Sequence, residues 1–146
     1  MRQRSSGEFE IPLPMARAMT CFTPEGERMW VPGWEPAYAT GQASESPGTV
    51  FTTVVDGVET IWVIIGIDRV AGRAAYARIT PGHHAGTVRV RCSEEPSRRT
   101  VARVDYDMSP LSEDPGVLDH FAQPEFGRML RGWSVLIAEM IARQSA

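Results

Sequence analysis

The segment that begins at Pro124 places the strongest constraint on what this chain can fold into. Its apolar residues fall at steps of three and four, the spacing of one helical face. They are Phe126, Met129, Leu130, Trp133, Leu136, Ile137, Met140 and Ile141. The spacing predicts one long amphipathic helix of roughly five turns. We expect the rest of the chain to form an apolar surface that this helix covers.

The chain before this helix has the pattern of antiparallel strands at hairpin spacing. Residues 50–55 are mostly β-branched, Asp56-Gly57 is a two-residue turn signal, and residues 59–70 hold the most apolar run, IWVIIGI. Further strands are predicted at residues 73–80, 87–93 and 100–108, with a first strand at 8–13. The sequence therefore predicts a meander of consecutive strands.

Two short helices are predicted between the first strand and the second. Residues 15–22 carry apolar side chains at helical spacing. The segment Thr23-Pro24-Glu25-Gly26-Glu27 then offers an N-cap, a proline in the first turn and early carboxylates. A polar loop follows at residues 41–48, and a further short helix is expected from Ser112 to about Phe121.

Length and composition indicate one α+β domain. The chain has 146 residues, of which 42% are hydrophobic and 23% charged, so we expect a single domain over residues 1–146, with residues 1–7 as a flexible arm. The expected fold is a helix grip, in which a curved antiparallel sheet of six or seven strands wraps around the C-terminal helix. Such a helix cannot touch the whole inner surface of a strongly curved sheet, so the two are expected to enclose a cavity.

Charge and residue usage exclude several functions. A net charge of −3 gives no support for nucleic-acid binding. All fifteen basic residues are arginine, which excludes chemistry that requires a lysine. No stretch is apolar enough for a signal peptide or a membrane span, so a cytoplasmic protein is expected. Cys21 and Cys92 lack a C-x-x-C partner and are interpreted as buried thiols.

The order of elements, the segment from Phe22 to Trp34 (FTPEGERMWVPGW) and the tryptophan in the last helix together resemble the START-like superfamily. This superfamily, also described as Bet v 1-like, SRPBCC or polyketide cyclase/dehydrase-type, has a helix-grip fold, and the resemblance covers roughly residues 8–143. It includes lipid carriers, plant allergens, aromatase/cyclases, hormone receptors and Aha1-like co-chaperones. The resemblance therefore implies the fold and leaves the function open among these classes.

The predicted ligand site is the cavity between the sheet and the last helix. The segment from Trp30 to Tyr38 combines aromatic rings with prolines and a glycine, which suits the mouth of an apolar pocket. The alternative is that its tryptophans simply plug the domain against the helix. The residues expected to contact a ligand are Trp30, Trp34, Tyr38, Phe51, Trp62, Ile64, Tyr76, Val104, Tyr106, Met129, Trp133 and Ile137.

Polar residues in these segments supply the candidates for catalysis. Glu35 beside a tryptophan is a candidate acid or base, with a solvated turn residue as the alternative. Tyr106 is the candidate for a hydroxyl that points into the chamber, with a core tyrosine bonded to backbone as the alternative. Arg78 shares a strand face with Tyr76 and is expected to form a surface charge pair, with binding of a ligand carboxylate as the alternative. His83-His84 is interpreted as an exposed turn, and neither a metal site nor a cofactor is expected.

Three functions are compatible with these features. The first is binding of a hydrophobic small molecule, such as a lipid, a polyketide or an aromatic compound. The second is a polyketide cyclase or dehydratase-like enzyme, which needs at least two proton-transfer groups facing one void. The third is an Aha1-like protein-interaction domain, which would have a filled core. Both faces of the strand at residues 59–70 are apolar, so a homodimer is one way to cover the outer face.

Overall fold

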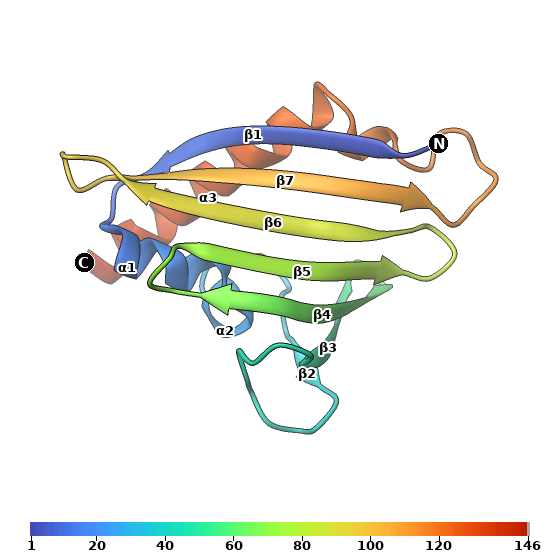
Figure 1. The fold of residues 1–146 in the computed structure, drawn as a ribbon, viewed down its shortest axis with the longest axis horizontal. Helices are drawn as coiled ribbons and strands as arrows, with labels where there is room; N and C mark the ends of the chain where they lie inside the picture. Colours follow the sequence, from blue (N-terminus) through green and yellow to red (C-terminus); the bar gives the residue numbers. More distant parts are fainter. Residues whose placement is uncertain (146) are drawn as a thin grey trace.

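The computed structural model describes residues 1–145 and has the predicted fold class. One curved antiparallel sheet carries a long helix, α3 (Glu125–Ser145), along one side (Figure 1). The seven strands are β1 (Gln3–Ile11), β2 (Ala37–Tyr38), β3 (Val50–Val55), β4 (Val58–Asp68), β5 (Arg73–Thr80), β6 (His84–Glu94) and β7 (Thr100–Pro110). The short helices are α1 (Met15–Ala18), η1 (Met19–Phe22), α2 (Pro24–Glu27) and η2 (Asp119–Phe121).

The sheet is a meander closed by the first strand. Strands β2 to β7 are neighbours in chain order, and β1 pairs with β7 at the far edge. The turn between β3 and β4 consists of Asp56 and Gly57, with φ angles of 52° and 77°. Two positive φ values are what a tight two-residue hairpin requires. The predicted hairpin and the strand order are therefore both confirmed.

The first strand is longer than the sequence pattern indicated. Residues 3–7, expected as an arm, pair with β7 and belong to β1. The Ser5 hydroxyl donates a hydrogen bond to the Phe121 carbonyl at 2.6 Å. A Cβ atom on Gly7 would lie 2.5 Å from Leu130 Cδ1, so α3 passes directly over this strand. The inward-facing residues in this part of β1 are Ser5 and Gly7. Because neither is apolar, the alternation of hydrophobic residues does not reveal the strand here.

Two other element boundaries differ from the prediction. Strand β6 begins at His84, three residues before the predicted start, because His84 and Gly86 continue the ladder opposite Pro110 and Met108 of β7. The predicted helix at residues 112–121 is reduced to η2. In the turn before it, the Asp114 carboxylate accepts a hydrogen bond from the backbone N–H of Gly116 at 2.9 Å. This local bond stabilises a turn in place of a helix.

Helix α3 covers only part of the inner face of the sheet. Phe126, Leu130, Ile137 and Met140 are its buried residues. Its contacts with the sheet fall mainly on β1. The inner faces of the central strands are therefore covered by another part of the chain. This is the segment after α2, in which Trp34 packs on Phe51 and Trp62. No helix within residues 1–145 is long and apolar enough to span a membrane.

The short helices fold as the capping signals predicted. The Thr23 Oγ1 atom accepts a hydrogen bond from the backbone N–H of Gly26 at 3.0 Å and donates one to the Thr20 carbonyl at 2.8 Å. A Cβ atom on Gly26 would lie 1.6 Å from the Thr20 oxygen, so this position requires glycine. Cys21 and Cys92 are both buried free thiols, as predicted. Burial raises their pKa values to about 11 and about 12.

Candidate ligand-binding cavity

A cavity of about 450 Å³ lies between the inner face of the sheet, the segment from Phe22 to Trp34 and helix α3. All four tryptophans of the chain line it. The lining residues from the helices and loops are Phe22, Glu27, Trp30, Val31, Trp34, His83, His120, Met129 and Trp133. Those from the strands are Phe51, Thr53, Val55, Val58, Thr60, Trp62, Tyr76, Arg78, Thr80, His84, Val88, Val90 and Tyr106.

The aromatic walls are held in place by hydrogen bonds to the protein. The indole N–H of Trp30 donates to the Cys21 carbonyl at 2.8 Å, and that of Trp34 to the Pro24 carbonyl at 2.9 Å. The indole N–H of Trp62 donates to Thr53 Oγ1 at 3.0 Å. Because these N–H groups are satisfied internally, the rings present apolar surface to the cavity in fixed orientations.

The rings also pack on one another around the cavity. Trp62 and Phe51 are stacked, with centroids 6.1 Å apart and planes 7° apart. Trp34 meets Trp62 edge-on at 5.5 Å, and Trp30 meets Trp133 edge-on at 5.7 Å. Pairs of this kind stabilise a fixed arrangement by about 1 kcal/mol each beyond their buried area. The cavity is therefore preformed rather than created by a ligand.

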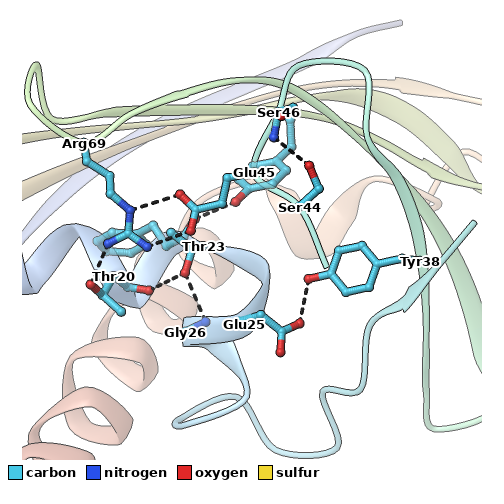
Figure 2. Close-up of polar contacts among 11 residues, drawn as sticks. Thr20, Thr23, Glu25, Gly26, Tyr38, Ser44, Glu45, Ser46 and Arg69 are labelled. Atoms are coloured by element: carbon cyan, nitrogen blue, oxygen red, sulfur yellow. Dashed lines mark hydrogen bonds and ion pairs between the residues drawn. The ribbon is translucent and has the colours of Figure 1, made fainter. Parts of the chain in front are cut away.

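A network of polar contacts anchors η1 and α2 to the neighbouring loop and strands (Figure 2). Arg69 donates to Thr20 at 2.9 Å and forms an ion pair with Glu45 at 2.7 Å. The Tyr38 hydroxyl donates to Glu25 at 2.6 Å. These contacts connect the polar loop and the strands to η1 and α2. They hold α2 over the part of the inner face of the sheet that α3 does not cover.

Glu27 is the acidic group of the cavity. It follows Glu25 by two residues, but Glu25 is exposed, whereas Glu27 turns inward and lines the cavity. Burial raises the pKa of the Glu27 carboxyl to about 8, although the nearby Arg78 cation acts to lower it. At neutral pH this carboxyl is therefore mostly protonated and acts as a hydrogen-bond donor.

Arg78 brings a positive charge into the same cavity. Its guanidinium carbon lies 5.2 Å from the centroid of the Trp62 ring, 5.3 Å from that of Phe121 and 5.9 Å from that of Tyr106. Its Nε atom is buried and has no hydrogen-bond partner among residues 1–145. The expectation of a surface charge pair is therefore wrong, because β5 directs this residue to the inner face.

Two tyrosines add hydroxyl groups to the lining. The Tyr76 hydroxyl donates to the Phe22 carbonyl at 2.6 Å and so has a structural partner. Tyr106 is buried between Phe126, Trp133 and Arg78. Burial raises the pKa of Tyr106, and Arg78 opposes this shift. Its hydroxyl therefore stays protonated, and the residue lines the cavity.

His84 and His120 form the end of the cavity near η2. The His84 ring is buried and lies 4.8 Å from the Phe121 ring and 6.2 Å from the His120 ring. In the described part of the chain, residues 1–145, neither of its nitrogens has a hydrogen-bond partner. The interpretation of His83-His84 as an exposed turn is thus wrong for His84, which begins β6 and faces inward. Within residues 1–145 no group of three or more His, Cys, Asp or Glu residues is arranged to hold a metal ion.

The burial of His84 leads to a prediction for stability in acid. Burial lowers its pKa to about 4, so between pH 6.5 and 4 the unfolded chain binds a proton here that the folded chain does not. Stability is therefore lost as the pH falls through this range. We expect His84→Phe, which keeps a ring beside Phe121, to be more stable than the wild type at pH 4 by about 3 kcal/mol, measured by urea unfolding. At pH 7 the two should be similar, and equal stabilities at both pH values would contradict this assignment.

Trp133 tests the boundary between core and cavity. Its ring is half-buried, contacts Phe9 and Trp30 and also lines the cavity. A fully packed tryptophan loses about 3–5 kcal/mol on replacement by alanine. Because one side of this ring faces the void, we expect Trp133→Ala to destabilise the protein by about 2 kcal/mol in urea unfolding. A loss at the full core value would show that the ring is packed on all sides.

The structure brings together most of the residues predicted to contact a ligand. Those that line the cavity are Trp30, Trp34, Phe51, Trp62, Tyr76, Tyr106, Met129 and Trp133. Ile64, Val104 and Ile137 are at most 1% exposed and belong to the packed core instead. Tyr38 lies outside the lining, bonded to Glu25, and Glu35 is exposed and also outside it. Glu35 is therefore a solvent-exposed loop residue that follows the turn at residues 32–33.

The sequence reasoning missed Glu27 as a site residue. The capping pattern identifies Glu27 only as an early helical carboxylate, yet it stands three residues before Trp30 and four before Val31. Those separations place all three on one side of a helical turn. That signal was present in the sequence, whereas the burial that changes the chemistry of Glu27 depends on contacts distant in the chain.

The curved seven-stranded sheet with its long C-terminal helix is a helix-grip fold, the fold of Bet v 1-like structures. No protein-family model and no curated protein matches the chain. Among solved structures, Ara h 8.0201 superposes with a TM-score of 0.73 and 14% identity, covering 97% of this chain and 99% of its own. Norcoclaurine synthase from Thalictrum flavum gives 0.65 and 13%, covering 95% and 88%. Protein MLL2253 from Mesorhizobium loti gives 0.70 and 11%, covering 97% and 98%. Identities this low establish the fold alone, which confirms the resemblance at that level.

Proposed function

We propose that this protein binds a hydrophobic, aromatic small molecule in the cavity between the sheet and α3. The observation that carries the proposal is the preformed void of about 450 Å³ with tryptophan walls, within the roughly 300–1,000 Å³ of most ligand sites. A second structure of norcoclaurine synthase, which superposes with a TM-score of 0.59, is a complex with dopamine and hydroxybenzaldehyde. A protein-interaction domain of the Aha1 type would instead be expected to have a filled core.

The tryptophans provide a direct test of this proposal. N-phenyl-1-naphthylamine is a neutral aromatic dye whose emission rises in apolar surroundings and which accepts excitation energy from nearby indoles. Because all four tryptophans line the cavity, we expect saturable energy transfer to one bound dye per chain. Native mass spectrometry of the purified protein should show the same stoichiometry. The absence of saturable transfer would contradict the proposal.

Acid–base catalysis on the enclosed molecule is a second candidate function. Glu27 favours it, because its pKa of about 8 lets it exchange a proton near neutral pH beside the Tyr106 hydroxyl and the Arg78 cation. A suitable probe is 5-nitrobenzisoxazole, which opens to a coloured phenolate when a base removes its ring proton. We expect turnover that increases as the pH rises through about 8 and that Glu27→Gln abolishes. Equal rates in the two proteins would exclude Glu27 as the base.

We also propose that the protein is cytoplasmic and that it forms a homodimer. Support for the dimer comes from the outer face of β4, where Ile65 is 43% exposed and Ile61 and Val63 are half-buried. Light scattering coupled to size-exclusion chromatography measures the oligomeric state. A monomer at all concentrations would contradict the homodimer.

A further inference from the structure

Arg78 is the arginine that lines the cavity, and it does so without an acidic partner among residues 1–145. On the surface, Arg2 pairs with Asp107 at 2.6 Å and Arg69 pairs with Glu45 at 2.7 Å. Within residues 1–145, no carboxylate lies within ion-pair distance of Arg78, and its buried Nε has no hydrogen-bond partner. The chain thus directs a guanidinium into an aromatic cavity without providing its counter-charge.

The groups that surround Arg78 do not replace an anion. Three aromatic rings lie within 5.9 Å of its guanidinium carbon and stabilise the cation through their faces. Such contacts do not occupy the in-plane N–H donors of a guanidinium, and the Nε donor of Arg78 has no partner among residues 1–145. The other ionisable groups that line the cavity are Glu27, Tyr76, Tyr106 and the histidines. Burial raises the pKa of Glu27 and of both tyrosines, so at pH 7 they contribute little negative charge.

We propose that the ligand is an organic acid, with a flat aromatic body against the tryptophan walls and one carboxylate on the Arg78 guanidinium. This inference rests on the proposed function, because it specifies the chemical class of the molecule that the cavity binds. A carboxylate matches the planar fork of an arginine with two parallel hydrogen bonds. Their strength increases in a cavity from which water is excluded.

The experiment compares two competitors that differ only in charge. At pH 7, 2-naphthoate and 2-naphthamide have nearly the same size and shape, but only the first is an anion. Each is titrated against protein loaded with N-phenyl-1-naphthylamine, and loss of the dye signal gives its affinity. We expect the wild type to bind naphthoate about tenfold or more tightly than naphthamide.

Variants of Arg78 assign that preference to its charge. Arg78→Met should still bind the neutral dye, which shows that the cavity is intact, but should lose the preference for naphthoate. Arg78→Lys should retain part of the preference because it keeps the positive charge. The matched control is Arg89→Met, which removes an exposed arginine from the neighbouring strand β6 and should leave the preference unchanged.

The outcomes separate this inference from the proposed function. If the dye binds and both competitors displace it equally from the wild type, the ligand class is wrong while the cavity remains a binding site. If Arg78→Met keeps the wild-type preference, Arg78 is not the anion-binding group. If the dye does not bind to the wild type at all, the proposed function itself fails.

Discussion

Val88→Trp is expected to abolish binding of N-phenyl-1-naphthylamine, with a loss of affinity of about a hundredfold or more. Val88 stands in the middle of β6, opposite Tyr76 on one neighbouring strand and Tyr106 on the other. Its side chain is 5% exposed and lines the cavity. An indole at this position would project into the void and occupy the volume that the dye needs. Titration of the dye, monitored by its emission, measures the loss.

Two further variants make this result interpretable. Val70→Trp introduces the same side chain at a position that is 89% exposed, and we expect it to bind the dye like the wild type. Val90→Phe fills the neighbouring part of the cavity with a smaller ring and should weaken binding even if Val88→Trp fails to fold. If a folded Val88→Trp variant bound the dye with wild-type affinity, the binding site would lie outside the cavity.

Glu27→Gln is expected to stabilise the protein at pH 9 by about 4 kcal/mol. The pKa of Glu27 is about 8 in the folded chain and near 4.5 in the unfolded chain, so between these values only the folded chain holds the proton. Stability at this site is therefore present in full below pH 4.5 and is lost as the pH rises towards 8. Glutamine does not ionise and avoids the loss. Urea unfolding at pH 4.5 and pH 9 should show equal stabilities at the lower value and the gain at the higher.

Glu25→Gln is the matched control, because its shift has the opposite sign. Hydrogen bonds from Tyr38 and Arg28 lower the pKa of Glu25, so its carboxylate stabilises the fold above pH 4.5. Replacing it should reduce stability at pH 9 instead of increasing it. The effect of Glu27 is clearest above pH 6.5, because below that value the titration of His84 opposes it. If Glu27→Gln gave no gain at pH 9, the carboxyl would not be desolvated.

The fold was predictable because its signals are local and repeat along the chain. Alternation marked the strands of the meander, Asp56-Gly57 marked a hairpin, and Thr23-Pro24 marked a helix start. Spacing alone identified the helix that follows Pro124. The first five residues of β1 escaped because Ser5 and Gly7 carry no apolar signal, and their inward positions are determined by Phe121 and by Leu130 of α3.

The site was predictable only in part, because strand parity gives the face of the sheet and not the position along it. Trp62 and Ile64 share the inner face, yet Trp62 lines the cavity and Ile64 is packed in the core. The same limit applies to Arg78, whose inward direction follows from parity with Tyr76. From the sequence alone, a charged side chain is expected at the surface. Only the structure shows that the inner face beside Arg78 borders a cavity. Glu27 becomes unusual only through its burial, which the sequence does not record.

The position of a bound molecule shows whether the space between the sheet and α3 is the binding site. Nuclear Overhauser effects between unlabelled N-phenyl-1-naphthylamine and the methyl groups of isotope-labelled protein identify which side chains touch it. We expect contacts to Val88, Val90 and Met129, which line the cavity from β6 and α3. Contacts instead to Val54 or Val135, which are each 56% exposed, would place the molecule on the outer surface and contradict binding in the cavity.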